Sequence, residues 1–167
     1  MNRTKKMVYI SLLISMAIAL QIFEGIIAIP LPYGAKLGLA NIIALVTVEM
    51  FSVKELILVN SMRVLLGSLL RGTFLSSTFW ISCGGVILSS IAIILVKKFT
   101  EQSILGLSII SAIFHNIGQV IVIIILYGNS SLAVILPLLI IICIPTGIFV
   151  GISAKGIISK LQNIGSI

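Results

Sequence analysis

Two arginines and an asparagine share one face of an apolar segment near the middle of the chain. Asn60, Arg63, Gly67 and Arg71 are spaced by three, four and four residues, which places them on one side of a helix. An arginine guanidinium is planar and can hold two oxygens of a phosphate or a carboxylate at once. The spacing therefore predicts an anion-binding face. The alternative is that Arg63 pairs with a glutamate and that Arg71 extends to the outer membrane surface.

A second polar group interrupts a later apolar segment. His115, Asn116 and Gln119 fall within five residues, and His115 is the only histidine in the chain. His115 and Gln119 share a helical face, and Asn116 lies about 100° around the helix from His115. These side chains are suited to hydrogen bonding in a binding site. The alternative is a hydrogen-bond cluster that joins neighbouring helices.

Residues 34–41, with the sequence GAKLGLAN, open another apolar segment. Their glycines permit the close approach of a backbone or a ligand. Lys36 adds a cation near a helix N-terminus, which already favours anions. We therefore predict that Lys36 and Asn41 contact the ligand. The alternative for Lys36 is a side chain that extends to the membrane surface.

Two of the glutamates lie near the ends of apolar segments. Glu24 is expected to accept hydrogen bonds from Arg63 or Arg71, or to contact the ligand directly. Glu49 lies close in sequence to Lys54, and we predict a structural ion pair between these two residues.

The composition is that of an integral membrane protein. Hydrophobic residues make up 59% of the chain and charged residues 9%, and the mean hydropathy is +1.31. Soluble domains are about half apolar and about a quarter charged, so lipid is the solvent that suits this chain. We expect an all-α bundle forming a single transmembrane domain over residues 1–167. The net charge of +7 does not indicate nucleic acid, because the basic residues sit at the ends of apolar segments.

Six apolar segments predict about six transmembrane helices. They cover residues 7–28, 37–51, 53–70, 74–96, 104–127 and 132–154. The second and third are short, and one long helix is the alternative. We expect two helices, because Ser52 and Glu55 form the S-x-x-E pattern of a capping box at a helix start.

Orientation follows from the lysines and arginines. With the N-terminus inside, the inner connections hold eight of them: Arg3, Lys5, Lys6, Lys54, Lys97, Lys98, Lys155 and Lys160. The outer connections hold two, Lys36 and Arg71. This asymmetry predicts that both termini lie in the cytoplasm and that the number of spans is even.

The polar residues then define one outward-facing cavity. Lys36, Arg71, Glu24 and Arg63 fall in the outer half of the bundle, and the polar group on the fifth helix falls at mid-depth. Charged side chains within a membrane usually face the bundle interior and mark a site. We predict that the cavity binds a small anionic molecule, with no catalytic residue, metal or cofactor.

Small residues recur on one face of the first helix. Ser11, Ser15 and Ala19 are spaced by four residues, a pattern that lets another helix approach closely. The face either docks a second membrane protein or packs against helices of this chain.

Several stretches in this order resemble a bacterial family labelled "heptaprenyl diphosphate synthase component I" and also "Gx transporter". They are the basic N-terminus with its small-residue first helix, GAKLGLAN at 34–41, RVLLGSLLRG at 63–72 and HNIGQ at 115–119. The resemblance covers essentially the whole chain. The family in turn resembles the S components of energy-coupling factor (ECF) transporters. Those are six-helix membrane proteins that bind a vitamin or similar micronutrient and pair with a transmembrane T subunit and two cytoplasmic ATPases.

The resemblance implies a substrate-binding subunit for a small anionic micronutrient or an isoprenoid or quinone precursor. It also implies that Ser11, Ser15 and Ala19 form the surface presented to the T subunit. The chain has no aspartate, whereas prenyl diphosphate synthases need aspartates to hold Mg²⁺. We therefore expect no enzyme. The alternatives are a membrane accessory subunit of a heptaprenyl diphosphate synthase and a solitary carrier.

Overall fold

The computed structural model describes residues 2–26 and 38–163, and every regular element in that part of the chain is helical. The elements are α1 (Arg3–Ile26), α2 (Leu39–Met50), α3 (Val53–Leu70), α4 (Ser77–Phe99), α5 (Ile104–Tyr127), the 3-10 helix η2 (Ser130–Ile135) and α6 (Leu136–Asn163). The expectation of an all-α protein is therefore confirmed.

Four helical stretches of the described chain are long and apolar enough to cross a membrane. They are α1, α4, α5 and the continuous stretch Ser130–Asn163. α2 has 12 residues and spans about 18 Å, short of the roughly 30 Å hydrocarbon core. α3 has 18 residues but carries Lys54, Glu55 and Arg63. All six predicted segments form helices, and the number that crosses the bilayer stays a prediction.

The break between α2 and α3 falls at the predicted place. The amide of Phe51 closes α2 with a bond to the Thr47 carbonyl, and Ser52 is the N-cap of α3. The capping box differs from the prediction in one respect. The Ser52 hydroxyl donates to the Glu55 carboxylate instead of accepting a bond from a backbone amide. Glu55 also pairs with Lys6 of α1 at 2.5 Å, which ties the start of α3 to the first helix.

α6 continues well past residue 154, where the predicted span ends. Its last turns remain part of the bundle because Ile158 is buried in the core, while Lys155 and Lys160 are exposed. A helix need not end where its membrane-embedded part ends. Lys155 and Lys160 therefore do not predict the end of α6.

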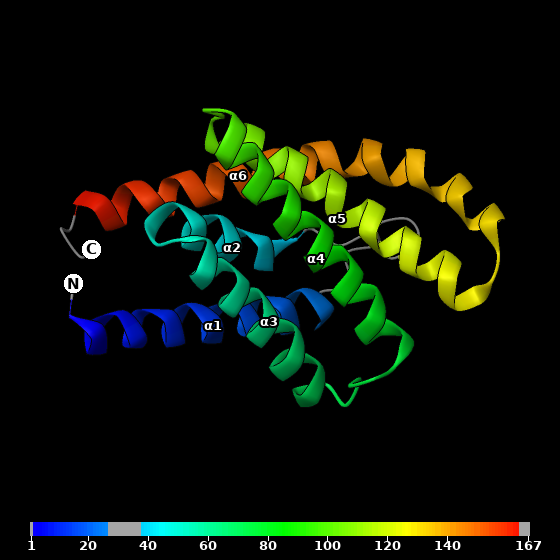
Figure 1. Ribbon diagram of the computed structural model, residues 1–167, viewed down its shortest axis with the longest axis horizontal. Coiled ribbons are helices and arrows are strands. Elements are labelled where there is room, and N and C mark those ends of the chain that lie inside the picture. The colour runs from blue at the N-terminus through cyan, green and yellow to red at the C-terminus, as the bar shows by residue number, and fades with distance from the viewer. Residues whose placement is uncertain (1, 27–37, 164–167) are drawn as a thin grey trace.

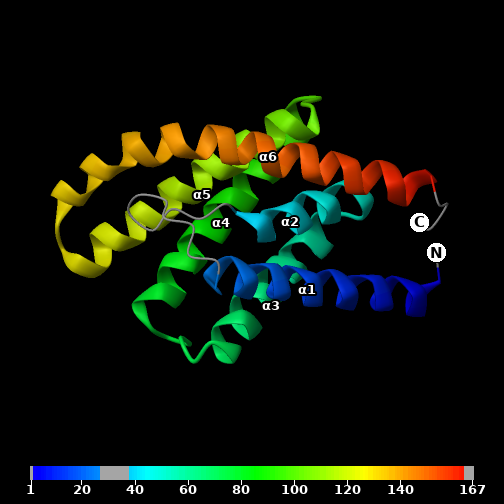
Figure 2. The same cartoon turned by 180° about the vertical axis from the view of Figure 1, so that it is seen from behind.

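The first turn of α1 and the last turn of α6 lie at the same end of the bundle (Figure 1, blue and red). The connection between α5 and α6 lies at the opposite end, as the view from behind also shows (Figure 2). α4 and α5 make the most extensive contact, followed by α5 and α6. A chain whose first and last helices begin and end at the same end of the bundle is compatible with an even number of membrane crossings.

The short helix α2 lies inside the bundle. Every residue from Ile42 to Val48 is buried, and α2 contacts α1, α3, α5 and α6. A helix that is apolar on all sides is covered either by other elements or by lipid. In this chain α2 is covered by its neighbouring helices, which hold its first turn among them.

Glycines bring the later helices into backbone contact. A Cβ atom added at Gly118 of α5 would lie 2.3 Å from the carbonyl oxygen of Gly84 of α4. On α6, a Cβ atom at Gly147 or Gly151 would lie 3.1 Å from the backbone of α5. Small residues at helix interfaces allow the close packing that holds membrane bundles together.

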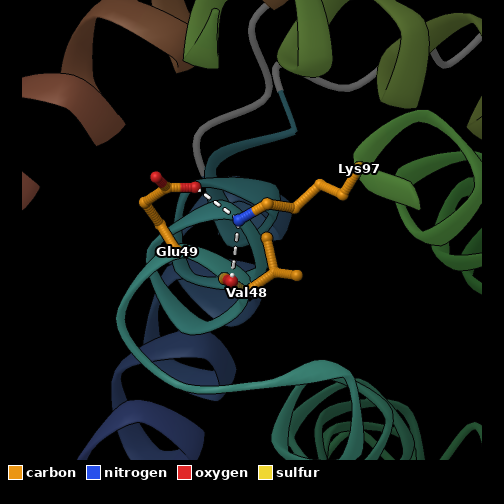
Figure 3. Close-up of polar contacts among 3 residues, drawn as sticks. All are labelled: Val48, Glu49 and Lys97. Atoms are coloured by element: carbon orange, nitrogen blue, oxygen red, sulfur yellow. Dashed lines mark hydrogen bonds and ion pairs between the residues drawn. The ribbon is translucent and has the colours of Figure 1, made fainter. Parts of the chain in front are cut away.

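Lys97 of α4 clamps the end of α2. Its ammonium pairs with Glu49 at 2.6 Å and donates to the Val48 carbonyl at 3.1 Å (Figure 3). Cations stabilise the carbonyl end of a helix. The predicted partner of Glu49 was Lys54, and that prediction is wrong: the partner is the long side chain of Lys97, which reaches from α4 to the end of α2.

Replacing Lys97 by glutamine (Lys97→Gln) is expected to lower the free energy of unfolding by about 0.5–1 kcal/mol, since pairs that are about a third exposed contribute little. Unfolding of the purified protein in detergent measures the change. Lys98→Gln is the matched control, because Lys98 is exposed and has no carboxylate partner among the described residues. Equal stabilities of the two variants would contradict the clamp.

Candidate functional site

A cavity with a volume of about 70 Å³ lies among the helices. All of the helices α1 to α6 contribute to its wall. The polar side chains that line it are Gln21, Glu24, Asn41, Arg63, Ser82, Ser108, Ser111, His115, Asn116, Gln119 and Thr146. This volume holds a few water molecules, which suits a small polar group better than a long apolar chain.

Arg63 is the cationic residue of the described wall. The side chain is 4% exposed, and its Nη1 atom donates to Asn41 Oδ1 at 3.2 Å. Its Nε atom is buried and has no hydrogen-bond partner among the described residues. Burying a charge without compensating partners is unfavourable. The wall of a polar cavity therefore contains a buried cation with an unsatisfied donor.

Glu24 does not pair with an arginine, although the sequence favoured such a pair. Its Oε1 atom accepts a hydrogen bond of 2.5 Å from the Gly38 amide. Among the described residues, ion pairs within 4.0 Å join Lys6 to Glu55 and Lys97 to Glu49. The formal charges of Glu24 and Arg63 balance in the described wall. Lys36, another cation predicted near the cavity, lies outside the described residues.

α5 supplies the largest polar surface of the cavity. Ser108, Ser111, His115 and Gln119 follow one another at helical spacing, and Asn116 lies beside them. The Ser108 hydroxyl already donates to the Gly147 carbonyl of α6 at 2.7 Å.

α4 packs tightly against this polar face of α5. A Cβ atom at Gly85 would lie 2.8 Å from Cε1 of His115 and 2.9 Å from Cγ of Gln119. α4 thus has a glycine where these two side chains need room, and the contact limits how far they can turn away from the cavity.

Two residues predicted for the site lie outside the cavity wall. Asn60 donates to Ser90 Oγ at 2.9 Å and joins α3 to α4. Arg71 follows the last turn of α3, where its Nε donates to the Gly67 carbonyl at 3.1 Å. Both residues share a side of α3 with Arg63. The cavity, however, meets α3 only at Arg63 and Val64.

The sequence reasoning missed several polar residues of the wall. Gln21 precedes Glu24 by one helical turn, and its amide packs against Gly67. Ser82 and Thr146 come from α4 and α6. The spacing of Gln21 and Glu24 on one face of α1 was a usable signal, because a large polar side chain inside an apolar segment rarely faces lipid. Single serines and threonines give no comparable signal.

Ser11, Ser15 and Ala19 are all exposed in this chain. The opposite side of α1 packs inward through Ile10 and Ala17. The helices of the described chain therefore leave the small-residue face uncovered.

A profile of the family described as heptaprenyl diphosphate synthase component I matches residues 13–157. The chain belongs to this family. No curated protein and no solved structure matches the chain. In this member of the heptaprenyl diphosphate synthase component I family, the matched region contains every residue of the cavity wall. It also contains most of the length of each of the helices α1 to α6.

The side chains of the described wall can bind a ligand through hydrogen bonds and charge. Its functional groups are amides, hydroxyls, an imidazole, one guanidinium and one carboxylate. Over residues 2–26 and 38–163, no three His, Cys, Asp or Glu side chains come close enough to hold a metal. Hydrogen-bond donors around a buried guanidinium recognise an oxyanion.

Proposed function

We propose that this chain is the substrate-binding membrane subunit of an energy-coupling factor transporter and captures a small anionic compound from outside the cell. The substrate is a vitamin-like acid or an isoprenoid or quinone precursor. The chain lies in the bacterial cytoplasmic membrane with both termini inside. It needs no cofactor and catalyses no covalent step.

The observation that carries the proposal is the buried Arg63 at a polar cavity. A guanidinium that is 4% exposed, with an unpartnered Nε among the described residues, is unfavourable in the empty protein. An oxyanion would supply the missing acceptor through a charge-assisted hydrogen bond. The cavity volume suits the anionic group of such a ligand.

The exposed face of α1 supports a partner in the membrane. Around Ser11, Ser15 and Ala19 the same side of α1 also exposes Leu12 and Met16. Small residues flanked by large apolar ones let a second helix approach closely. The partner in this proposal is a T subunit, which joins the chain to two cytoplasmic ATPases. The chain itself contains no G-x-x-x-x-G-K-[ST] motif to bind ATP.

A second candidate is suggested by the name of the family. In that case the chain is a membrane accessory subunit of a heptaprenyl diphosphate synthase, and Arg63 binds the diphosphate of the product. The catalytic aspartates would reside in a separate soluble subunit, because this chain has none.

Co-purification separates the candidates. A tagged chain isolated from its own membranes is expected to bring with it a T subunit and ATPases. Ser15→Leu is expected to abolish this capture, because the longer side chain holds the partner helix away from α1. Ser61→Leu is the matched control, since Ser61 is an exposed serine on α3.

Capture of a soluble, aspartate-rich synthase in place of the ATPases would support the second candidate and overturn the first. Isolation of the chain with neither partner would point to a solitary carrier and overturn both.

A further inference from the structure

The first turn of α2 opens onto the cavity, and its N-cap residue has no side chain that could cap it. That residue is Gly38, with a φ of 76°. The first amides of a helix have no partner within the helix, and the N-terminus of a helix favours anions. Gly38, Ala40 and Asn41 all line the cavity, so α2 directs this anion-attracting end toward the ligand space.

Arg63 points to the same place independently. Its Nη1 atom bonds to Asn41, which lies in the first turn of α2. Its buried Nε atom has no partner among the described residues. The helix N-terminus and the guanidinium therefore form two sides of one anion seat.

A carboxylate of the protein occupies part of this seat. Glu24 Oε1 accepts a hydrogen bond from the Gly38 amide at 2.5 Å, although residues 27–37 separate the two in sequence. Glu24 lies in the last turn of α1, where the helix dipole disfavours a negative charge. Its position therefore brings no benefit to α1. The favourable contact is the one with α2.

We propose that Glu24 is an internal substitute for the ligand's anionic group. In the empty protein it holds the Gly38 amide. A carboxylate or phosphate of the ligand displaces it, taking the first turn of α2 and the Nε atom of Arg63. The Glu24 carboxylate and the anionic group of the ligand cannot both occupy the seat, because two like charges in contact repel strongly in a low dielectric. This inference rests on the proposed function and adds that Glu24 competes with the ligand.

Calorimetric titration with inorganic phosphate tests the inference on the purified full chain in detergent. Glu24→Gln and Glu24→Ala are expected to bind phosphate at least about tenfold more tightly than the unmodified protein, because the competing charge is gone. Glu101→Gln is the matched control: it removes the same charge at an exposed position between α4 and α5 and should leave the affinity unchanged. A parallel titration with acetate shows whether the seat prefers a carboxylate or a phosphate.

Unchanged or weaker binding in the Glu24 variants, with binding still dependent on Arg63, would overturn the competition and leave the proposed function standing. Binding that survives Arg63→Gln would instead overturn the proposed function. Glu24→Gln keeps an acceptor oxygen for the Gly38 amide, so it provides the result if Glu24→Ala fails to fold.

Discussion

Arg63→Gln is expected to weaken binding of the anionic ligand by about 100-fold or more. Hydrogen bonds to a charged group contribute about 1.5–3 kcal/mol each, and a change of 1.4 kcal/mol is tenfold in affinity. The variant removes the guanidinium but keeps a polar side chain that can reach Asn41. Equilibrium binding on purified protein measures the loss, with the natural ligand once identified or with inorganic phosphate.

The matched control is Arg71→Gln. Arg71 is the same residue type on the same helix, but it bonds to the Gly67 carbonyl and lies outside the cavity wall. Its replacement should leave the affinity within about twofold, since surface substitutions away from a site have small effects. Equal losses in both variants would mean that the net charge of the outer half, and not the cavity, attracts the ligand.

Arg63→Gln should also leave the empty protein at least as stable as the unmodified chain. Arg63 has no ion-pair partner within 4.0 Å among the described residues, and its desolvation outweighs its favourable charge interaction with Glu24, so its removal eliminates a net penalty. Function and stability would then oppose each other at this residue, as is common at binding sites. A lower melting temperature of the variant without ligand would identify Arg63 as a structural residue.

Gly118→Ala is expected to destabilise the protein by about 3 kcal/mol, the upper part of the range for overpacking. The new methyl group would lie 2.3 Å from the Gly84 carbonyl oxygen and 3.0 Å from Leu88 Cβ. Because the nearest atom is backbone, α4 and α5 must move apart. Reversible unfolding in mixed detergent micelles measures the free energy.

Gly156→Ala is the matched control for this substitution. Gly156 also lies inside a helix, but an added Cβ atom there has no neighbour within 4 Å. The control should be neutral or slightly stabilising, because alanine favours helix by up to about 1 kcal/mol over glycine. If both variants unfold alike, the close approach of α4 and α5 does not hold the bundle together.

Local signals predicted the helices well wherever a cap fixes the end. α3 and α5 begin and end as expected, because Ser52 and Ser103 are N-caps and Gly128 ends α5 in the left-handed conformation. The predicted span over residues 132–154 stops before the end of α6 at Asn163, because lysines give no signal for where a helix ends. The sequence predicted α2 as a membrane span, and its burial among the other helices could not be inferred, because lipid and protein both suit an apolar helix.

The site was predictable in part. Arg63, Asn41, Glu24 and the polar residues of α5 do line one cavity. Asn60 was expected there because it shares a helical face with Arg63, but spacing along one helix does not say where the other helices meet it. The Glu49–Lys97 pair joins residues far apart in sequence. The prediction relied on nearness in sequence and therefore named Lys54. Such contacts depend on helix packing, which in this chain follows glycines such as Gly118 and Gly84.

Native mass spectrometry of the protein purified from its own membranes tests most directly whether the cavity binds a small anion. The expected result is a retained compound whose mass identifies a carboxylate or a phosphate, present in the unmodified protein and absent from Arg63→Gln. A neutral sugar or a cation retained in the cavity, or an anion retained equally by both proteins, would contradict the assignment.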